Sequence, residues 1–426
     1  MKFVCKKSRL CGEVTIPGSK SHTIRAVAIA SLAEGVSQIR APLASADTLA
    51  AVEAYRRLGA TIEIQSDLWR VEGTGGELQA PDDVIDVKNS GTTMRTVLGS
   101  CALLRSGLAV VTGDAQVRNR PAGPLADSLC ELGARVRSTR NNGKPPLVVE
   151  GRLRGGETTI EALTSQYVTS LLLNAPLADG GTTLHVPVLN EQPYVEMTLD
   201  WLGRQGIQVE HDQMRCFHIP GAQRYRTVDR RIPADFSSAT FFLAAGALGD
   251  NEVVLRGLDM SDCQGDKAVV DYLVAMGANI EIQPDAIRVR GGQLRGMELD
   301  LNATPDALPM MAVVGCFARG TTRLVNVPQA RIKETDRIAV MRAELERMGA
   351  CVRELEDGLV VEESPLAGTE LCGHDDHRVV MALAVAGLAG GGETRIDSAE
   401  AVEVTFPTFV DCMKGLGANL DVYPDE

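Results

Sequence analysis

Basic side chains recur beside stretches rich in serine, threonine, asparagine and glycine, as in Ser19-Lys20-Ser21 and Ser90-Gly91-Thr92. Such stretches are typical of helix starts, where unpaired backbone N–H groups and the helix dipole attract anions. A nearby cation adds a second attraction, so the set predicts a ligand carrying several negative charges. For any single stretch, a plain helix cap with a solvated cation remains an alternative. The cations concerned are Lys20, Arg25, Arg95, Arg118, Arg120, Lys333, Arg337 and Arg378.

Two carboxylates accompany these cations. Asp306 opens an apolar helix and could be either a helix cap or a general base. Glu334 stands between Lys333 and Arg337 and could be either an ion-pair partner or a general acid. Neighbouring cations lower carboxylate pKa values unless the groups are buried. A proton-transfer role therefore requires a substrate that neutralises those cations or excludes water.

The segment His374-Asp375-Asp376-His377 has the composition of a metal cluster. Four adjacent residues cannot all face the same side of a helix, so the spacing does not suit a metal centre. A helix cap or a proton shuttle fits the segment as well. We therefore expect no metal at this segment.

Six glycines each end a helix-like segment and precede an alternating, strand-like one. Their successive spacings are 74, 73, 71, 72 and 68 residues, a period that indicates one supersecondary unit copied six times. Glycine at this place supplies the positive φ that closes a helix. The glycines are Gly59, Gly133, Gly206, Gly277, Gly349 and Gly417.

Each copy reads as two helices and four strands in the order βαβαββ. The first helix of each copy is apolar nearly all round, as in residues 26–33, which predicts burial. The second is amphipathic and runs into a hairpin. Twelve main helices with mixed sheets give an α/β (α+β) class. Six copies divide as three and three, and the polar segment 221–231 is the expected linker.

Composition narrows the functional classes. The 426 residues are 44% hydrophobic, which is ample for packed cores, and the net charge of −13 disfavours nucleic acid as a partner. Ten scattered cysteines without a C-x-x-C pair suit reduced thiols in the cytoplasm. The chain has neither an apolar run of membrane-spanning length nor a signal-peptide core at its start, so we expect a cytoplasmic protein without membrane association.

Several motifs together resemble the 5-enolpyruvylshikimate-3-phosphate (EPSP) synthases. They occur in that family's order and cover essentially the whole chain, and Lys-Glu-Thr-Asp-Arg followed by Asp-His-Arg is the most specific pair. The motifs are residues 17–26 (PGSKSHTIRA), 89–95 (NSGTTMR), 120–121 (RP), 165–167 (SQY), 305–307 (PDA), 332–337 (IKETDR), 376–378 (DHR) and 405–407 (TFP).

The resemblance implies two domains of three βαβαββ units each, an inside-out α/β barrel type, joined by a hinge. One domain would span 18–231 and the other 1–17 plus 232–426, with the active site in the cleft between them. The implied enzyme is a monomeric transferase (3-phosphoshikimate 1-carboxyvinyltransferase) without a cofactor, of the pathway to the aromatic amino acids. It moves the enolpyruvyl group of phosphoenolpyruvate to the 5-hydroxyl of shikimate 3-phosphate and releases phosphate. Glyphosate is the expected inhibitor.

The resemblance also assigns roles to individual residues. Asp306 would take the proton of the attacking hydroxyl, Glu334 would protonate C3 of phosphoenolpyruvate, and Lys20 would bridge both substrates. Shikimate 3-phosphate would be held by Lys20, Ser21, Arg25, Thr164, Ser165, Gln166, Tyr194, Asp306, Gln329 and Lys333. Phosphoenolpyruvate would be held by Lys20, Gly91, Arg95, Arg120, Gln166, Arg337 and Arg378.

The chain departs from the family pattern at three places. Glu191-Gln192 replaces a phosphate-binding Ser-Lys pair of some members, Val404 replaces a late Lys, and Gln329 replaces an Asn. Because a carboxylate repels phosphate, Glu191 either points away or indicates a different acceptor. The alternatives are therefore a paralogue with a non-shikimate or UDP-amino sugar acceptor, and a non-catalytic anion-binding module. The loop 112–121 lacks the reactive Cys of the UDP-sugar enzymes, and a mere binder has no need of Asp306 and Glu334.

Overall fold

The computed structural model describes residues 1–424, which divide into two compact units. The central unit is Gly18–Ile232, and the terminal unit combines Met1–Pro17 with Pro233–Glu426. The second break lies one residue after the expected one. Residues 425 and 426, which the expected second domain includes, lie outside the described part.

Twelve α-helices occur within the described residues, as expected from six copies of two. The first helix of each copy is largely buried, because alanine, leucine, valine and phenylalanine surround it on all sides. Side chains of Ser19, Ser90, Thr164, Asp235 and Asp376 cap five of these helices. The buried helices are α1 (Lys20–Leu32), α3 (Gly91–Cys101), α5 (Ser165–Asn174), α7 (Phe236–Ala247), α9 (Leu308–Phe317) and α11 (His377–Ala389).

The second helix of each copy is amphipathic and ends at one of the six repeated glycines. All six glycines have positive φ, which confirms their predicted role as helix terminators. These helices are α2 (Ala46–Arg57), α4 (Gly123–Glu131), α6 (Gln192–Gln205), α8 (Ala268–Ala275), α10 (Arg337–Arg347) and α12 (Phe409–Gly415).

The strands of residues 1–424 form six four-stranded sheets, three in each unit. In every sheet the first pair of neighbours is parallel and the other two pairs are antiparallel. The central unit has β14 (Asp229–Arg231)-β3 (Glu34–Arg40)-β5 (Leu68–Thr74)-β4 (Thr61–Ile64), β6 (Ile85–Asp86)-β7 (Leu108–Thr112)-β9 (Leu147–Glu150)-β8 (Arg135–Ser138) and β10 (Gly156–Thr159)-β11 (Thr182–His185)-β13 (Cys216–Ile219)-β12 (Glu210–Asp212). The terminal unit has β2 (Cys11–Thr15)-β15 (Glu252–Arg256)-β17 (Ala286–Arg290)-β16 (Asn279–Gln283), β18 (Glu298–Asp300)-β19 (Thr321–Val325)-β21 (Gly358–Glu362)-β20 (Val352–Leu355) and β22 (Glu370–Leu371)-β23 (Glu393–Ile396)-β1 (Lys2–Lys6)-β24 (Asn419–Tyr423).

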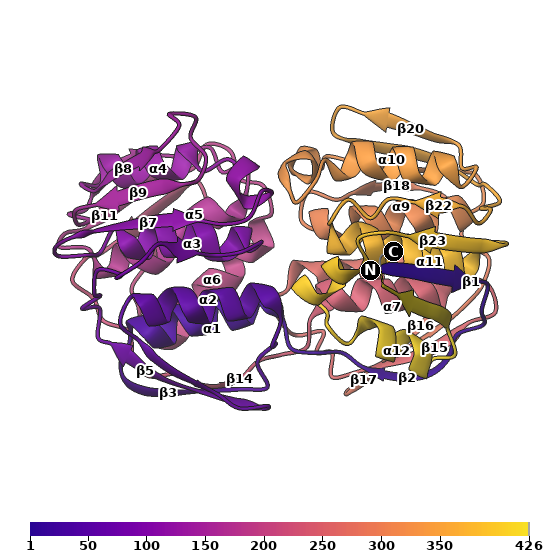
Figure 1. Ribbon diagram of the computed structural model, residues 1–426, viewed down its shortest axis with the longest axis horizontal. Coiled ribbons are helices and arrows are strands. Elements are labelled where there is room, and N and C mark those ends of the chain that lie inside the picture. Colours follow the sequence, from indigo (N-terminus) through magenta and orange to yellow (C-terminus); the bar gives the residue numbers. More distant parts are fainter. Residues whose placement is uncertain (425–426) are drawn as a thin grey trace. The chain divides into compact units, whose positions relative to one another are not determined.

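Three strands join a sheet other than that of the copy they flank in sequence. Strand β2 precedes α1 but pairs in parallel with β15, whereas β14 precedes α7 but pairs in parallel with β3. Strand β1 lies between β23 and β24 and completes the sixth copy from the opposite end of the chain. Figure 1 shows β1 beside β23. The βαβαββ pattern is therefore present six times, but three copies are completed by a strand from elsewhere in the chain.

The prediction that residues 221–231 form a linker is wrong in part. Residues 229–231 form β14, and Tyr225 and Val228 ahead of it are buried. The Tyr225 hydroxyl donates to the Leu173 carbonyl at 2.8 Å, and Val228 N donates to Ser37 Oγ at 2.9 Å. The polar composition concealed two apolar anchors that attach this segment to the central unit.

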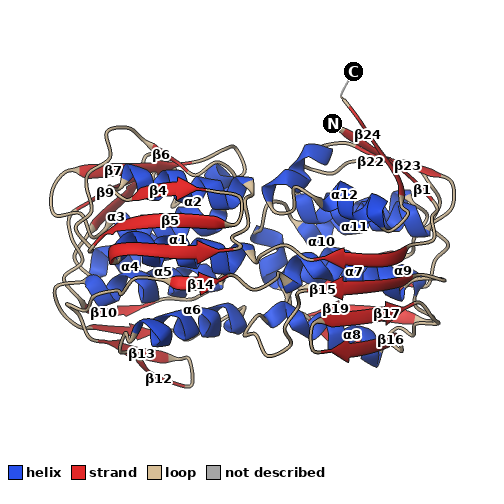
Figure 2. Ribbon diagram, turned by 90° about the horizontal axis from the view of Figure 1, so that it is seen from below, coloured by secondary structure: helices blue, strands red, loops and turns tan. Residues whose placement is uncertain are grey.

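In each unit the strands lie over the helices, as β3 and β5 do over α1 (Figure 2). The apolar first helices fill the interior and the polar faces of the strands are exposed, which is the inside-out arrangement. All twelve residues of α7 are buried, for example. Among the described residues, no helix combines the length and the apolar composition needed to cross a bilayer.

Candidate active site

Three carboxylates converge on one buried guanidinium in the terminal unit. Arg337, the first residue of α10, is 1% exposed. Its Nη1 donates to Asp306 Oδ1 at 2.8 Å and its Nη2 to Glu334 Oε2 at 2.6 Å. Its Nε and Nη2 donate to the two oxygens of Asp376 at 2.8 and 3.1 Å. A single cation thus fixes three carboxylates that come from three different parts of the sequence.

Asp306 lies in the short 3₁₀ turn η4 (Pro305–Ala307) that precedes α9, and it does not cap a helix. Its second oxygen accepts from Arg378 Nη2 at 2.9 Å. Each oxygen of this carboxylate therefore contacts a different arginine. Glu334 is the ion-pair partner that its position beside Arg337 allowed.

The carboxylates also determine the protonation of Arg337. Burial by itself lowers the pKa of a guanidinium, but the charges of Asp376, Glu334 and Asp306 outweigh burial and raise the pKa of Arg337 above its usual value. Arg337 therefore stays protonated, and its single positive charge is paired with three carboxylates.

Asp376 was missed as a site residue in the sequence. Its side chain is fully buried, and its oxygens accept from Arg337, from Thr335 Oγ1 and from the backbone N–H of Arg378. A helix cap was one of the alternatives left open for this segment, and Asp376 does cap α11. A carboxylate has lone pairs for several donors, so one residue both starts α11 and positions Arg337.

Four other residues of the terminal unit were singled out in the sequence: Arg378, Lys333, Gln329 and Val404. Arg378 is in the first turn of α11, 3% exposed, and its Nη1 donates to the Ser237 carbonyl at 3.4 Å. Lys333 is half-buried and directly follows the 3₁₀ segment η5 (Pro328–Ile332). Gln329 within that segment is buried and donates from Nε2 to the Asn302 carbonyl at 2.9 Å. Val404 ends the 3₁₀ segment η6 (Ala399–Val404).

In the central unit, Arg95 and Arg120 lie beside the start of α3. Arg95 donates from Nη1 to Gln166 Oε1 at 2.6 Å and from Nη2 to the Pro121 carbonyl at 2.9 Å. Arg120 is 6% exposed and its Nη2 donates to Asn89 Oδ1 at 3.3 Å. A Cβ added to Gly91 would collide with Arg120 Nη1, so the glycine makes room for this guanidinium.

The positive charge of Arg95 is compensated less by neighbouring groups than that of Arg337. Its hydrogen-bond acceptors are carbonyl and amide oxygens. Burial, together with the like charge of Arg120, lowers the pKa of Arg95, although Tyr167 and Glu191 act in the opposite direction. This part of the central unit therefore favours an anion.

Lys20 and Arg25 lie one turn apart on α1. Lys20 Nζ forms an ion pair with Asp47 Oδ2 of α2 at 3.1 Å. Arg25 is buried and bridges α1 to α5 and α6, donating to the hydroxyls of Thr169 and Thr198 and to the Tyr194 carbonyl. Its Nη1 also donates to the carbonyl of Ser21, whose side chain is half-buried. Asp47 was not predicted as a site residue, because its only signal in the sequence is that of an acidic residue in a first helical turn.

Glu191 points toward the start of α5. Its Oε2 accepts from Thr164 Oγ1 at 3.1 Å, from the Ser165 backbone N–H at 3.1 Å and from Ser165 Oγ at 2.7 Å. The expectation left open whether this carboxylate points away from Thr164 and Ser165. It does not.

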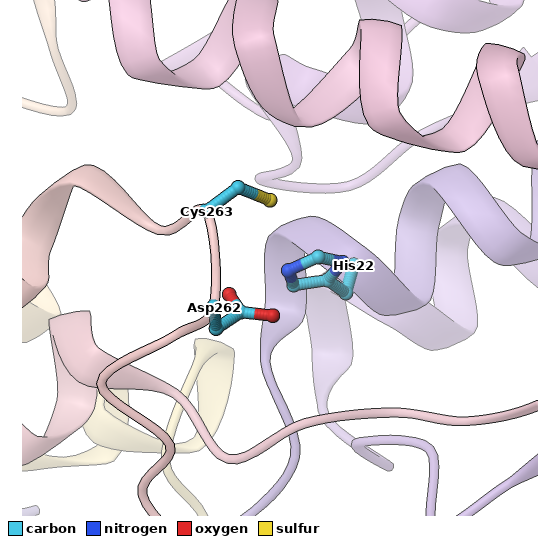
Figure 3. Close-up of side chains that lie close together, drawn as sticks. All are labelled: His22, Asp262 and Cys263. Carbon is cyan, nitrogen blue, oxygen red and sulfur yellow. The ribbon is translucent and has the colours of Figure 1, made fainter.

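His374, Asp376 and His22 are of types that can ligate a metal, but each contacts another protein group. His374 Nε2 lies 3.0 Å from Glu344 Oε1, and Asp376 is bound to Arg337. Figure 3 labels His22, Asp262 and Cys263, which are also of metal-ligating types. His22 Nδ1 accepts from the Trp201 indole N–H at 2.9 Å. We assign no metal site to these residues.

The family model of EPSP synthase (3-phosphoshikimate 1-carboxyvinyltransferase) matches residues 4–413. The chain belongs to the EPSP synthase family. A relative from Acetivibrio thermocellus named 3-phosphoshikimate 1-carboxyvinyltransferase is 55% identical, with 99% of each chain covered. A second with the same name, from Ruminiclostridium cellulolyticum, is 51% identical over 98% of this chain and 99% of the relative.

Solved structures agree with the family membership. An EPSP synthase from Acinetobacter baumannii superposes with a TM-score of 0.83 and 28% identity, covering 99% of this chain and 100% of the other. The enolpyruvyl transferase NikO from Streptomyces tendae reaches a TM-score of 0.79 at 21% identity, covering 100% and 99%, and shares the fold. This family member is therefore a transferase with an α/β fold, as the sequence predicts.

Proposed function

We infer that the chain transfers the enolpyruvyl group of phosphoenolpyruvate to the 5-hydroxyl of shikimate 3-phosphate and releases phosphate, the EPSP synthase reaction. The convergence of Asp306, Glu334 and Asp376 on Arg337 is the structural observation that best supports this function, because an anion-binding module has no use for clustered carboxylates. Family membership supplies the substrates, and the site residues are our assignment.

In the addition step, Asp306 accepts the proton of the 5-hydroxyl as that oxygen bonds to C2 of phosphoenolpyruvate. Glu334 delivers a proton to C3, which leaves a tetrahedral intermediate. In the elimination step the C2–O bond to phosphate breaks as Asp306 returns its proton to the departing phosphate. Glu334 takes back a proton from C3, so phosphate and the enolpyruvyl product form and both carboxylates regain their starting states. Both carboxylates are mostly buried, with side chains 18% and 10% exposed, so they act where electrostatic interactions are strong.

Glu334 can act as an acid only if its ion pair with Arg337 weakens. The hydrogen bonds of Arg337 already use Nε once, Nη1 once and Nη2 twice. A bound phosphoenolpyruvate anion would compete with Glu334 for this guanidinium. Competition of this kind raises the proton affinity of Glu334 at the moment when substrate is present.

The other cations would hold the substrates by charge. Phosphoenolpyruvate is assigned to Lys20, Gly91, Arg95, Arg120, Gln166, Arg337 and Arg378. Shikimate 3-phosphate is assigned to Lys20, Ser21, Arg25, Thr164, Ser165, Gln166, Tyr194, Asp306, Gln329 and Lys333. Because these residues come from both units, the proposal requires both units to contribute to one site. We further propose a cytoplasmic monomer that binds no nucleic acid; the ten cysteines, all free thiols, are compatible with a reducing compartment.

Phosphate release from phosphoenolpyruvate by the purified protein tests this function. We expect release with shikimate 3-phosphate and little with unphosphorylated shikimate or a UDP-amino sugar. Faster release with either alternative acceptor would overturn the assignment of the acceptor. No release with any of them would remove the catalytic proposal.

A further inference from the structure

Glu191 is a buried carboxylate at the start of α5. It is 2% exposed, and one of its oxygens accepts all three hydrogen bonds from Thr164 and Ser165. Two hydroxyls and a backbone N–H at the positive end of a helix are the donors that a phosphate oxygen uses. Glu191 therefore satisfies, from within the chain, donors suited to an external anion.

The backbone at Glu191 directs the side chain to this place. Glu191 has φ 58° and ψ 40°, in the left-handed region, immediately before α6. This conformation is uncommon for a residue with a Cβ and persists where surrounding contacts favour it. The Asn190 N–H, one residue earlier, donates to the Ala162 carbonyl at 3.1 Å, which holds this turn beside the segment leading into α5.

A conflict follows if Thr164 and Ser165 also bind the acceptor's phosphate, as the proposed function assigns. Two anions cannot accept the same three hydrogen bonds, and they repel each other at such distances. The next residue, Gln192, is exposed, so a Glu191 side chain that rotates outward has water beside it.

We propose that Glu191 is a specificity-determining residue that competes with the acceptor's phosphate: the phosphorylated acceptor binds by displacing the Glu191 carboxylate from Thr164 and Ser165. This inference rests on the proposed function. The competition lowers the affinity for the phosphorylated acceptor and leaves phosphoenolpyruvate unaffected. It also disfavours acceptors whose charge is too weak to displace a carboxylate.

Two variants separate the charge of Glu191 from its bulk. Glu191→Gln keeps the shape and removes the charge. Glu191→Gly removes the side chain, and glycine adopts the left-handed backbone without strain. Glu161→Gln is the matched control, because it removes an exposed carboxylate three residues before Thr164. Circular dichroism and thermal melting of the free proteins check that each variant is folded.

Calorimetric titration with shikimate 3-phosphate gives the first readout. We expect the dissociation constant to fall by about tenfold or more in Glu191→Gly, and by a smaller factor in Glu191→Gln, whose amide oxygen still accepts hydrogen bonds. The KM for phosphoenolpyruvate should stay within twofold, and Glu161→Gln should match the wild type. An acceptor affinity within twofold of the wild type in both variants, or weaker, would overturn the proposal.

Inorganic phosphate gives a second readout that does not depend on activity. Sodium phosphate should raise the melting temperature of Glu191→Gly more than that of the wild type, relative to sodium chloride at equal ionic strength. Equal shifts in the two proteins would contradict the inference. If the wild type instead releases no phosphate with shikimate 3-phosphate while this difference persists, the proposed function fails and the competition by Glu191 stands.

Discussion

Arg95 of the central unit and Arg337 of the terminal unit are both nearly fully buried, yet their pKa values shift in opposite directions. Burial and Arg120 lower the pKa of Arg95, whereas three carboxylates overcome burial and raise the pKa of Arg337. Arg95 donates to neutral oxygens and Arg337 donates to carboxylates. Burial alone therefore does not define the role of a cation.

The contrast indicates a division of labour between the two units. The central unit concentrates positive charge around Gly91, which suits an incoming anion. The terminal unit neutralises its arginine internally and so fixes Asp306 and Glu334 in position. Under the proposed function, the first arrangement would bind phosphoenolpyruvate, whereas the second would position the proton-transfer groups in addition to binding this substrate through Arg337 and Arg378.

The largest expected effect is on kcat, and it distinguishes the role in proton transfer from the role in binding phosphoenolpyruvate. Asp306→Ala should lower kcat by a factor on the order of 10²–10⁴, because a positioned base is lost, with little change in the KM for phosphoenolpyruvate, which Asp306 is not assigned to hold. Arg120→Met should mainly raise the KM for phosphoenolpyruvate, by about tenfold or more. Steady-state kinetics of phosphate release measure both, with the exposed Asp271→Asn as control. A normal kcat in Asp306→Ala would contradict the assigned role of the terminal unit.

The second-largest expected effect is on stability, because replacing Arg337 should lower the unfolding free energy more than replacing Arg95. Arg337→Met leaves three carboxylates without their shared cation and should cost about 3–5 kcal/mol of unfolding free energy. Arg95→Met leaves neutral acceptors and should cost about 1 kcal/mol. Urea unfolding of both variants provides the comparison. Equal losses, or a larger loss for Arg95→Met, would show that Arg95 is compensated as fully as Arg337.

Gly91→Ala tests the crowding of the central unit. The new methyl group would collide with Arg120 Nη1 and lie 3.1 Å from Arg95 Nη1, so Arg120 must move. We expect the KM for phosphoenolpyruvate to rise severalfold and inhibition by glyphosate to weaken. Stability should hardly change, because alanine is favourable in a helix. Inhibition assays at several phosphoenolpyruvate concentrations measure this effect, and identical glyphosate inhibition in both proteins would exclude the placement.

The smallest effect concerns the support of the terminal network. Glu344 on α10 accepts from the Cys372 N–H and lies 3.0 Å from His374, and so tethers the turn that carries Asp376. The hydrogen bond with Glu344 raises the pKa of His374 above its usual 6.5. Burial opposes the ionisation of Glu344, but the bonds from His374 and Cys372 outweigh it and lower its pKa below 4.5.

These directions define a pH window. The contribution of His374 is complete below pH 6.5 and is lost as the pH rises through its raised folded-state pKa. The contribution of Glu344 is complete above pH 4.5 and is lost as the pH falls through its lowered pKa. His374→Gln should therefore cost up to about 1 kcal/mol at pH 6 and less at pH 9. Urea unfolding at the two pH values tests this, and an equal or larger loss at pH 9 would contradict it.

The repeat was predictable because glycine at a helix end and a 3.6-residue apolar period are local signals. Gly59 and Gly277 both show the expected positive φ. The spacing of the residues did not predict the exchange of β2 with β14, although the family resemblance placed residues 1–17 with the second domain. Strands of similar alternation can pair with any suitable edge, so only tertiary structure selects β15 for β2 and β3 for β14.

Within the site, residue types were easier to predict than partners. The sequence singled out Asp306, Glu334 and Arg337. It left open whether Asp306 was a helix cap or a general base, and whether Glu334 was an ion-pair partner or a general acid. Asp376 was concealed by its second role as the cap of α11. Glu191 stood out in the sequence as a departure from the family pattern. Its left-handed backbone and the hydrogen bond that its carboxylate accepts from Ser165 are visible only in the structure.

Deuterium incorporation tests most directly the claim that carboxylates of the terminal unit move the protons. With both substrates in deuterated water, the wild type should introduce deuterium at C3 of phosphoenolpyruvate and of the product during reversible addition. Glu334→Gln should still bind both substrates but lose this incorporation by at least about a hundredfold. Incorporation at the wild-type rate in Glu334→Gln would contradict the account.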